Sequence, residues 1–171
     1  MSEILDLLVF LIPVYMSNAS PVVLGGGRPL DFGMKFSDGK RILGKGKTIQ
    51  GFAGGVLAGT CAGGIVALYY PLPFFSGPAE QFIAGFILAF GAMAGDSIGS
   101  FIKRRIGKDS GSPFIVDTFF FLLVSLVFVF PFANEQLYSI LNIGFLLVLT
   151  VIMHPLTNMM ANRAGLKKVP W

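Results

Sequence analysis

The sequence predicts an all-α integral membrane protein with five transmembrane helices. Of its 171 residues, 54% are hydrophobic and only 13% are charged, with a mean hydropathy of +0.75, whereas about a quarter of the residues in a soluble domain are charged. Five apolar runs have lengths that suit spanning helices. All thirteen Lys and Arg residues lie in only three of the segments outside these runs. We expect residues 1–171 to form a single membrane domain.

The apolar runs are read directly from the sequence. They cover about residues 4–24, 51–70, 82–99, 114–132 and 139–156. The first run does not resemble a signal peptide, because Glu3 and Asp6 stand where a basic segment should precede the apolar core. We expect it to be a retained helix, with Pro13 as a site for a kink. The single cysteine, Cys61, lies in an apolar run and excludes an internal disulfide.

The distribution of the cations predicts the orientation in the membrane. They lie between runs one and two, between runs three and four, and after run five. With five spans these three segments share one side, and the positive-inside rule assigns that side to the cytoplasm. We therefore expect the N-terminus outside, the C-terminus inside, and cytoplasmic loops over residues 25–50 and 100–113. The net charge of +4 arises from these loop cations and is explained by the orientation in the membrane. We therefore expect no nucleic-acid partner.

Glycine is abundant, with 22 residues, and it recurs at a regular spacing in two of the apolar runs. Two stripes repeat every four residues in runs two and three, at Gly51, Gly55, Gly59 and Gly63 and at Gly91, Gly95 and Gly99. Such stripes allow helix backbones to approach closely in lipid. The stripes therefore predict helix packing, and only Gly51 and Gly99, at the cytoplasmic ends, are candidates to face a ligand.

The first cytoplasmic loop has the composition of a phosphate-binding segment. Residues 25–50 contain seven glycines, six cations and two carboxylates, and backbone N–H groups together with Lys and Arg suit a polyphosphate. Residues 44–48 look like a P-loop, but Arg41 occupies the position of its first glycine and no strand precedes it. Composition alone favours nucleotide binding and lipid-headgroup binding about equally.

The second polar element follows run three. If that run continues as a helix, Asp96, Ser100, Lys103 and Arg104 share one face. Asp117 enters run four from the same side, so that Asp96 and Asp117 can approach each other. Ionisable groups in a span indicate a functional site, and two close carboxylates require a proton or a cation between them. Mg²⁺ with substrate phosphates fits this need; the alternative is that each aspartate forms a structural ion pair with Lys103, Arg104 or Lys108.

Two further polar residues lie inside apolar runs. Asn18 could donate to a base or a phosphate, although a hydrogen bond between helices is favoured. For His154, a packing role is favoured over proton transfer. The sequence contains no second histidine and no Ser-His-Asp order to support zinc or nucleophilic chemistry.

These motifs together resemble a known family. The segments Gly95-Asp96-Ser97, residues 100–104, Lys108-Asp109 and Asp117 are similar to the signature of the membrane CTP:phosphatidate cytidylyltransferases. Asn18, Pro21, residues 25–33, residues 38–44 and Gly46-Lys47-Thr48 resemble its archaeal branch, the CDP-archaeol synthases. The resemblance covers nearly the whole chain. The chain departs from the family in lacking the bacterial His-Gly-Gly before Asp117 and a second aspartate soon after it, so that Asp109 or Asp38 would have to supply any further metal ligand.

The resemblance implies cytidylyl transfer from CTP to an unsaturated diether lipid phosphate, 2,3-bis-O-geranylgeranylglycerol 1-phosphate, with Mg²⁺, at the cytoplasmic face. The products would be a CDP-activated lipid and pyrophosphate. Asp96 and Asp117 would bind the metal, with Lys103 and Arg104 as further catalytic residues. The expected nucleotide-binding residues are Asn18, Asp38, Lys45, Lys47, Thr48, Ser100 and Lys108.

Two other functions compete with this interpretation. A CDP-alcohol phosphotransferase should carry several aspartates in a longer pattern, of which residues 38–41 supply only the beginning. A transporter of an anionic metabolite should carry charged groups at mid-depth or in both halves of the membrane, and the predicted outer half has almost none. We regard both functions as less favoured than nucleotidyl transfer.

Overall fold

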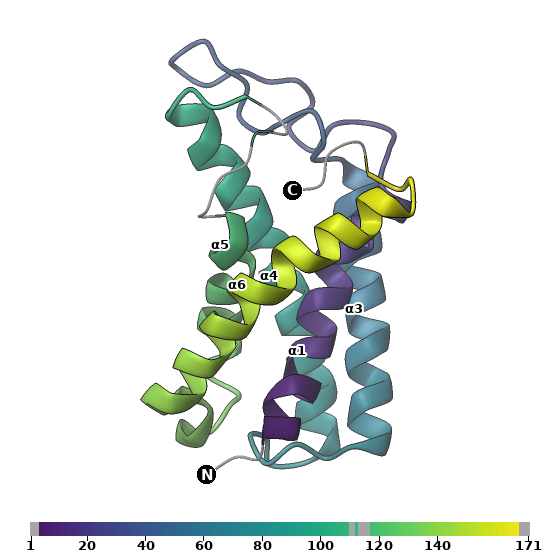
Figure 1. Cartoon of the computed structure of the whole chain (residues 1–171), viewed down its shortest axis with the longest axis vertical. Coiled ribbons are helices and arrows are strands. Elements are labelled where there is room, and N and C mark those ends of the chain that lie inside the picture. Colours follow the sequence, from purple (N-terminus) through teal and green to yellow (C-terminus); the bar gives the residue numbers. More distant parts are fainter. Residues whose placement is uncertain (1–3, 110–111, 113–116, 168–171) are drawn as a thin grey trace.

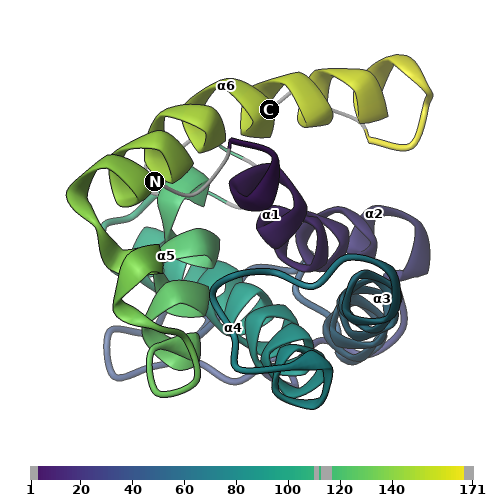
Figure 2. The same ribbon diagram turned by 90° about the horizontal axis from the view of Figure 1, so that it is seen from below.

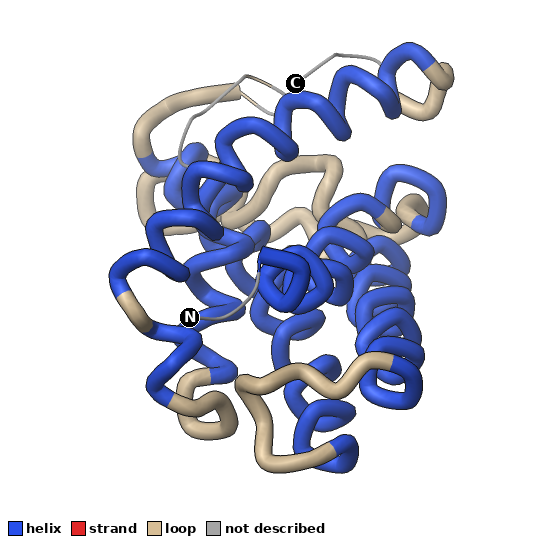
Figure 3. The backbone as a smooth tube through the Cα atoms, turned by 60° about the horizontal axis from the view of Figure 1, so that its bottom comes forward, coloured by secondary structure: helices blue, strands red, loops and turns tan. Residues whose placement is uncertain are grey.

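The fold is known from a computed structural model, which describes residues 4–109, 112 and 117–167. Its helices in chain order are α1 (Ile4–Ala19), α2 (Pro21–Leu24), α3 (Ile49–Tyr69), α4 (Pro78–Arg105), α5 (Asp117–Val129), the 3₁₀ helix η1 (Glu135–Tyr138) and α6 (Ile140–Arg163). The described residues form no strand, as Figure 3 shows, and only two isolated bridges pair Pro29 with Thr48 and Lys35 with Arg41. The predicted all-helical class is confirmed.

Four helical segments are long and apolar enough to cross a membrane. They are α1 together with α2 (Ile4–Leu24), α3, α4 and α6, with 21, 21, 28 and 24 residues. The predicted fourth run corresponds to α5, which is apolar but has 13 residues, fewer than a span needs. Residues 114–116 of that run lie outside the described residues. Four candidate spans are therefore present, and the fifth remains a prediction.

Two helices extend further than the apolar runs. Helix α4 continues to Arg105, so the first six residues of the predicted loop 100–113 are helical. The three cations in its last turn explain this extension, because cations at a helix C-terminus interact favourably with the helix dipole. Helix α6 runs through Pro155 to Arg163. Both extensions carry polar side chains beyond the apolar runs, toward the same end of the bundle.

The helices pack as a bundle with one oblique member. Helix α4 contacts α1, α3 and α5, and the buried core includes Phe10, Leu88 and Phe121. In Figure 1 the loop between α2 and α3 lies across one end of the bundle, and α6 crosses the outside obliquely. The view from below shows α6 along one side of the other helices (Figure 2). Only 17% of the apolar window of α6 is buried, so most of this helix faces outward.

The glycine stripes lie at helix–helix contacts, as predicted. An added Cβ at Gly59 would lie 2.6 Å from the Pro13 carbonyl oxygen of α1, and one at Gly63 would lie 2.8 Å from the Cα of Gly85 in α4. In the second stripe, a Cβ at Gly91 would lie 2.7 Å from the Cα of Ser125. The stripe in α3 therefore brings α1 and α4 close, and the stripe in α4 brings α5 close.

We expect Gly91→Ala to destabilise the bundle. The added methyl group would meet backbone atoms of α5, which cannot move without displacing that helix, and such overpacking costs about 1–3 kcal/mol. The measurement is the thermal unfolding midpoint in detergent. The control is Gly144→Ala, because an added Cβ at Gly144 has no neighbour within 4 Å. Equal midpoints for the two variants would contradict the close α4–α5 contact.

Candidate functional site

The loop over residues 25–48, called the basic loop below, is folded around a buried aspartate. Asp31 is 4% exposed. Its carboxylate accepts hydrogen bonds from the backbone N–H groups of Leu43 (2.9 Å) and Gly33 (3.0 Å), and it forms an ion pair with Arg41. Burial alone would raise the pKa of the Asp31 carboxyl, but the hydrogen bonds from Arg41 and from the backbone outweigh it and lower the pKa. The basic loop thus has a polar core of its own.

Replacing Asp31 with asparagine is expected to loosen the basic loop. The ionised carboxylate stabilises the loop above its ordinary pKa of 3.8, and this contribution is lost as the pH falls through the lower folded value. At neutral pH the substitution should cost about 1–3 kcal/mol. Chymotrypsin should then cleave the loop faster at Phe32 and Phe36, whereas the exposed control Lys35→Gln should leave cleavage unchanged. Equal cleavage of both variants would argue against this role of Asp31.

Two hydroxyl groups attach the basic loop to the helices. Thr48 caps α3, where its Oγ1 accepts hydrogen bonds from the N–H groups of Gly51 (3.0 Å) and Gly26 (3.2 Å). On α4, Ser100 Oγ accepts a hydrogen bond from the Gly44 N–H (3.1 Å). Both residues were predicted to bind nucleotide, and the structure shows that both hold the segment that carries Lys47.

Arg105 makes a third attachment between the basic loop and the helices, which the sequence did not predict. The Arg105 guanidinium lies over the rings of Phe36 and Phe101, 4.8 and 4.9 Å from their centroids. It also donates a hydrogen bond to the Arg41 carbonyl oxygen (2.6 Å) and forms an ion pair with Asp38 (3.1 Å). Asp38, predicted to bind nucleotide, therefore contacts Arg105. The sequence signal for this clamp is weak, because its two aromatic rings are 65 positions apart.

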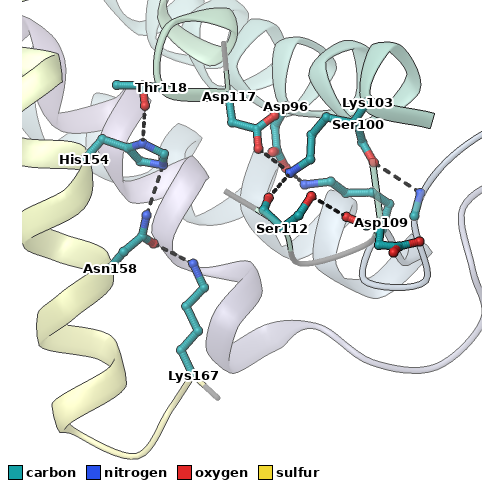
Figure 4. A network of polar contacts seen from close by, with 12 residues as sticks. Asp96, Ser100, Lys103, Asp109, Ser112, Asp117, Thr118, His154, Asn158 and Lys167 are labelled. Carbon is teal, nitrogen blue, oxygen red and sulfur yellow. Dashed lines mark hydrogen bonds and ion pairs between the residues drawn. The ribbon is translucent and has the colours of Figure 1, made fainter. Parts of the chain in front are cut away.

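Two lysine–aspartate pairs form the centre of the candidate site. Lys47 pairs with Asp96, and Lys103 Nζ lies 2.5 Å from Asp117 Oδ2 and 2.8 Å from the Ser112 carbonyl oxygen. We call Lys47, Asp96, Lys103 and Asp117 the charged centre, and Figure 4 shows the last three of these side chains close together. The side chains of Asp96 and Asp117 are 25% and 27% exposed, so both remain accessible. The pairing of Asp117 with Lys103 matches the structural alternative, whereas the partner of Asp96 was not predicted.

A glycine allows the two pairs to adjoin. An added Cβ at Gly99, one turn after Asp96 on α4, would lie 3.3 Å from Asp117 Oδ1. The first residue of α5 therefore lies directly against α4 at this level. Gly99, a sequence-based candidate to face a ligand, thus faces α5 and takes part in the helix packing predicted for its stripe.

A pocket opens beside the Lys47–Asp96 pair. It has an empty volume of about 270 Å³. Helices α2, α3 and α4 and the basic loop line it, and the lining residues include Pro21, Leu30, Lys47, Thr48, Asp96 and Ser97. Gly51, the other sequence-based candidate to face a ligand, also lines the pocket. The lining thus combines apolar side chains with an ammonium and a carboxylate.

Helix α6 adds polar groups next to the charged centre. His154 Nδ1 lies 3.1 Å from Thr118 Oγ1, and its Nε2 lies 3.2 Å from Asn158 Nδ2. Lys167, beyond α6, donates to Asn158 Oδ1 (2.8 Å) (Figure 4). Burial, followed by the positive charge of Lys47, lowers the pKa of the Lys167 ammonium. The hydrogen bonds of His154 and its contact with the Phe121 ring fit the predicted packing role, whereas Lys167 was not predicted.

The other predicted residues differ in their exposure. Asn18 is half-buried on α1, and Arg104 is half-buried on α4. The exposed residues are Lys45, Lys108 and Asp109. Within the described part of the chain, no group of three or more His, Cys, Asp or Glu residues could hold a metal ion. A metal at the charged centre would therefore have at most the two aspartates as carboxylate ligands.

Comparison with known proteins defines the class of this fold and site. A solved structure described as "Structural insight into an intramembrane enzyme for archaeal membrane lipids biosynthesis" superposes with a TM-score of 0.79, at 34% sequence identity, over 92% of this chain and 95% of that chain. This protein is accordingly a multi-pass membrane enzyme of lipid biosynthesis.

The family follows from sequence comparison. A family model described as "CarS-like: CDP-archaeol synthase" matches residues 1–171. The CDP-archaeol synthase of Pyrococcus horikoshii is 43% identical, over 100% of this chain and 99% of the relative. That of Archaeoglobus fulgidus is 44% identical, over 98% of each chain. The chain belongs to the CDP-archaeol synthase family, which confirms the predicted nucleotidyltransferase and sets aside the phosphotransferase and transporter alternatives.

Proposed function

We propose that the protein transfers a cytidylyl group from CTP to the phosphate of a diether glycerol lipid, which yields a CDP-activated diether lipid and pyrophosphate. The observation that carries this proposal is the charged centre beside a pocket, held beneath a folded basic loop. Family membership supports the choice of nucleotide and lipid, because the relatives are named CDP-archaeol synthases.

The reaction needs no covalent enzyme intermediate. An oxygen of the lipid phosphate attacks the α-phosphorus of CTP, and a new P–O bond forms. The bond from the α-phosphorus to the bridging oxygen breaks, and pyrophosphate leaves with the bonding electrons. The second pKa of a phosphate monoester is about 6, so the nucleophile is already an anion near neutral pH. Catalysis then depends mainly on positioning and on stabilising negative charge.

The two lysines of the charged centre supply that stabilisation. In the structure Lys47 and Lys103 pair with aspartates. When the triphosphate enters, each ammonium can turn from its carboxylate to phosphate oxygens. In the transition state, charge builds up on the leaving pyrophosphate, and fixed cations in a site shielded from water stabilise such charge strongly. Arg104, on the same helix, is a further candidate for this role.

Magnesium is the metal that fits the aspartates. Mg²⁺ commonly uses one or two carboxylates together with substrate phosphate oxygens, which matches Asp96 and Asp117, both partly exposed and accessible. The ion held by these two carboxylates would help to neutralise the charge of the triphosphate. It would also offset the charge that the aspartates expose when their lysines turn to the nucleotide.

The proposed arrangement in the membrane follows from the charges. We infer that the apolar run that contains α5 forms the fifth span. The N-terminus then lies outside, and the basic loop and the charged centre lie at the cytoplasmic face. CTP reaches this face from the cytosol, while the lipid chains remain in the bilayer.

The test is a turnover assay on the purified protein. CTP, Mg²⁺ and an unsaturated diether glycerol phosphate should yield pyrophosphate, whereas omission of the lipid or addition of EDTA should abolish its release. Diacyl phosphatidic acid and dCTP are the comparison substrates for selectivity. If pyrophosphate release is absent, or is independent of the lipid, the proposed function is wrong.

A further inference from the structure

The chain reverses direction directly after α6. Gly165 has φ +72°, and its N–H donates to the Asn162 carbonyl oxygen (2.9 Å), while the Leu166 N–H donates to that of Ala161 (2.9 Å). This pair of bonds is the Schellman pattern, which ends a helix at a left-handed residue. Asn162 Nδ2 also donates to the Lys167 carbonyl oxygen (2.8 Å). The turn thus folds Lys167 back alongside the last turns of α6.

A chain of hydrogen bonds fixes the ammonium of Lys167. Because Lys167 can only donate, it requires the oxygen of Asn158, and the amide nitrogen of Asn158 then faces His154 Nε2. Nε2 must accept, so Nδ1 carries the proton and donates to Thr118 Oγ1. Thr118 follows Asp117 directly. This series of hydrogen bonds therefore connects Lys167 to α5, the helix that carries Asp117.

The electrostatic environment of Lys167 indicates an anion site. Lys167 is half-buried, and its ammonium interacts electrostatically with Lys47, Asp96, Lys103 and Asp117. These interacting groups comprise three ammonium groups and two carboxylates, so one positive charge is in excess among them. The hydrogen bond to the neutral Asn158 holds this ammonium in place without neutralising it. A half-buried cation of this kind is stabilised when a phosphate binds.

We propose that Lys167 binds the phosphate of the lipid substrate; this inference rests on the proposed function. Lys47 lines the pocket beside α3 and α4, where the triphosphate would bind. Lys167 follows α6 and donates to Asn158 of that helix, whereas Asp96, Lys103 and Asp117 belong to α4 and α5 (Figure 4). In an in-line displacement the attacking and leaving oxygens lie on opposite sides of the phosphorus. Lys167 comes from an element that does not line the triphosphate pocket, so it is placed to bind the second phosphate, that of the nucleophile, next to a helix that faces mostly outward.

The test compares Lys167→Met with Arg163→Met. Each variant removes one positive charge from the same turn, and Arg163 is exposed, so this pair controls for a general loss of charge. We expect Lys167→Met to raise the KM for the diether lipid phosphate about 10-fold or more, with the KM for CTP unchanged. Lys167→Arg should recover part of the loss, and Arg163→Met should behave as wild type. An unchanged lipid KM, or a rise in the KM for CTP instead, overturns the proposal.

Two further measurements keep the test independent of folding and of turnover. Asn158→Ala retains Lys167 but removes the hydrogen bond that positions its ammonium. It should therefore raise the lipid KM by a smaller factor than Lys167→Met does. If Lys167→Met does not fold, Asn158→Ala and Lys167→Arg carry the test. Direct binding of a short-chain diether phosphate, measured without CTP, should weaken in Lys167→Met. If the wild type binds lipid through Lys167 yet releases no pyrophosphate, the proposed function fails and this inference stands.

Discussion

Asparagine in place of Asp96 is expected to lower pyrophosphate release by about 10²–10³-fold, the loss typical of removing one charge-stabilising group from an active site. The substitution keeps the size of the side chain and removes the charge that attracts a divalent ion. It also leaves Lys47 without its carboxylate partner, so the empty pocket becomes more positive. We therefore expect nucleotide without metal to bind at least as well as in the wild type, while turnover is lost.

The measurement is initial rate against Mg²⁺ concentration at saturating CTP and lipid. Asp117→Asn should behave in the same way, because its carboxylate occupies the equivalent position in the second pair. The matched control is Glu80→Gln, which removes a carboxylate from the first turn of the same helix, at the opposite end. Turnover close to that of the wild type in both aspartate variants would show that the ion pairs are structural.

Exchanging the charges of Lys103 and Asp117 gives a second large effect. The double variant Lys103→Asp/Asp117→Lys keeps an ion pair between α4 and α5, so its thermal unfolding midpoint should approach that of the wild type. Each single variant instead places two like charges together and should be less stable. Turnover should nevertheless fall about 10²-fold or more in the double variant, because the cation and the carboxylate have exchanged positions relative to the substrate phosphates.

The double variant distinguishes a structural role of the Lys103–Asp117 ion pair from a catalytic one. If the ion pair only joins the two helices, it does not matter which helix carries which charge. The two substitutions would then compensate for each other, and the double variant would regain both stability and turnover. If the pair is catalytic, the double variant regains stability but not turnover. Recovery of turnover in the double variant would therefore contradict the proposed function of Lys103 and Asp117.

Much of the fold was predictable because its signals are local. Apolar runs of span length define four of the helices, and the glycine stripes indicate where they touch. The ends of α4 and α6 were not predictable from hydropathy, since both helices continue into polar sequence. The 3₁₀ helix and the short α2 are likewise set by a few local hydrogen bonds rather than by a periodic pattern.

The candidate site was predictable where its residues share one helix face. Asp96, Ser100 and Lys103 follow from the helical repeat, and the start of α5 brings in Asp117. The partners of these residues depend on tertiary contacts. The pairing of Lys47 with Asp96 requires the folded basic loop, and the position of Lys167 requires the turn at Gly165. No spacing in the sequence reports such chain reversals, although a glycine after the last helix is the expected sign of one.

The attachment of residues 44–48 has a thermodynamic consequence. Gly44 is hydrogen-bonded to α4 and Thr48 caps α3, so the backbone on both sides of Lys47 loses its conformational freedom when the protein folds, before any nucleotide arrives. Binding then requires only side-chain rotation, and little ordering entropy opposes it. Lengthening this short tether by a residue or two should weaken nucleotide affinity even though every contacting atom is retained.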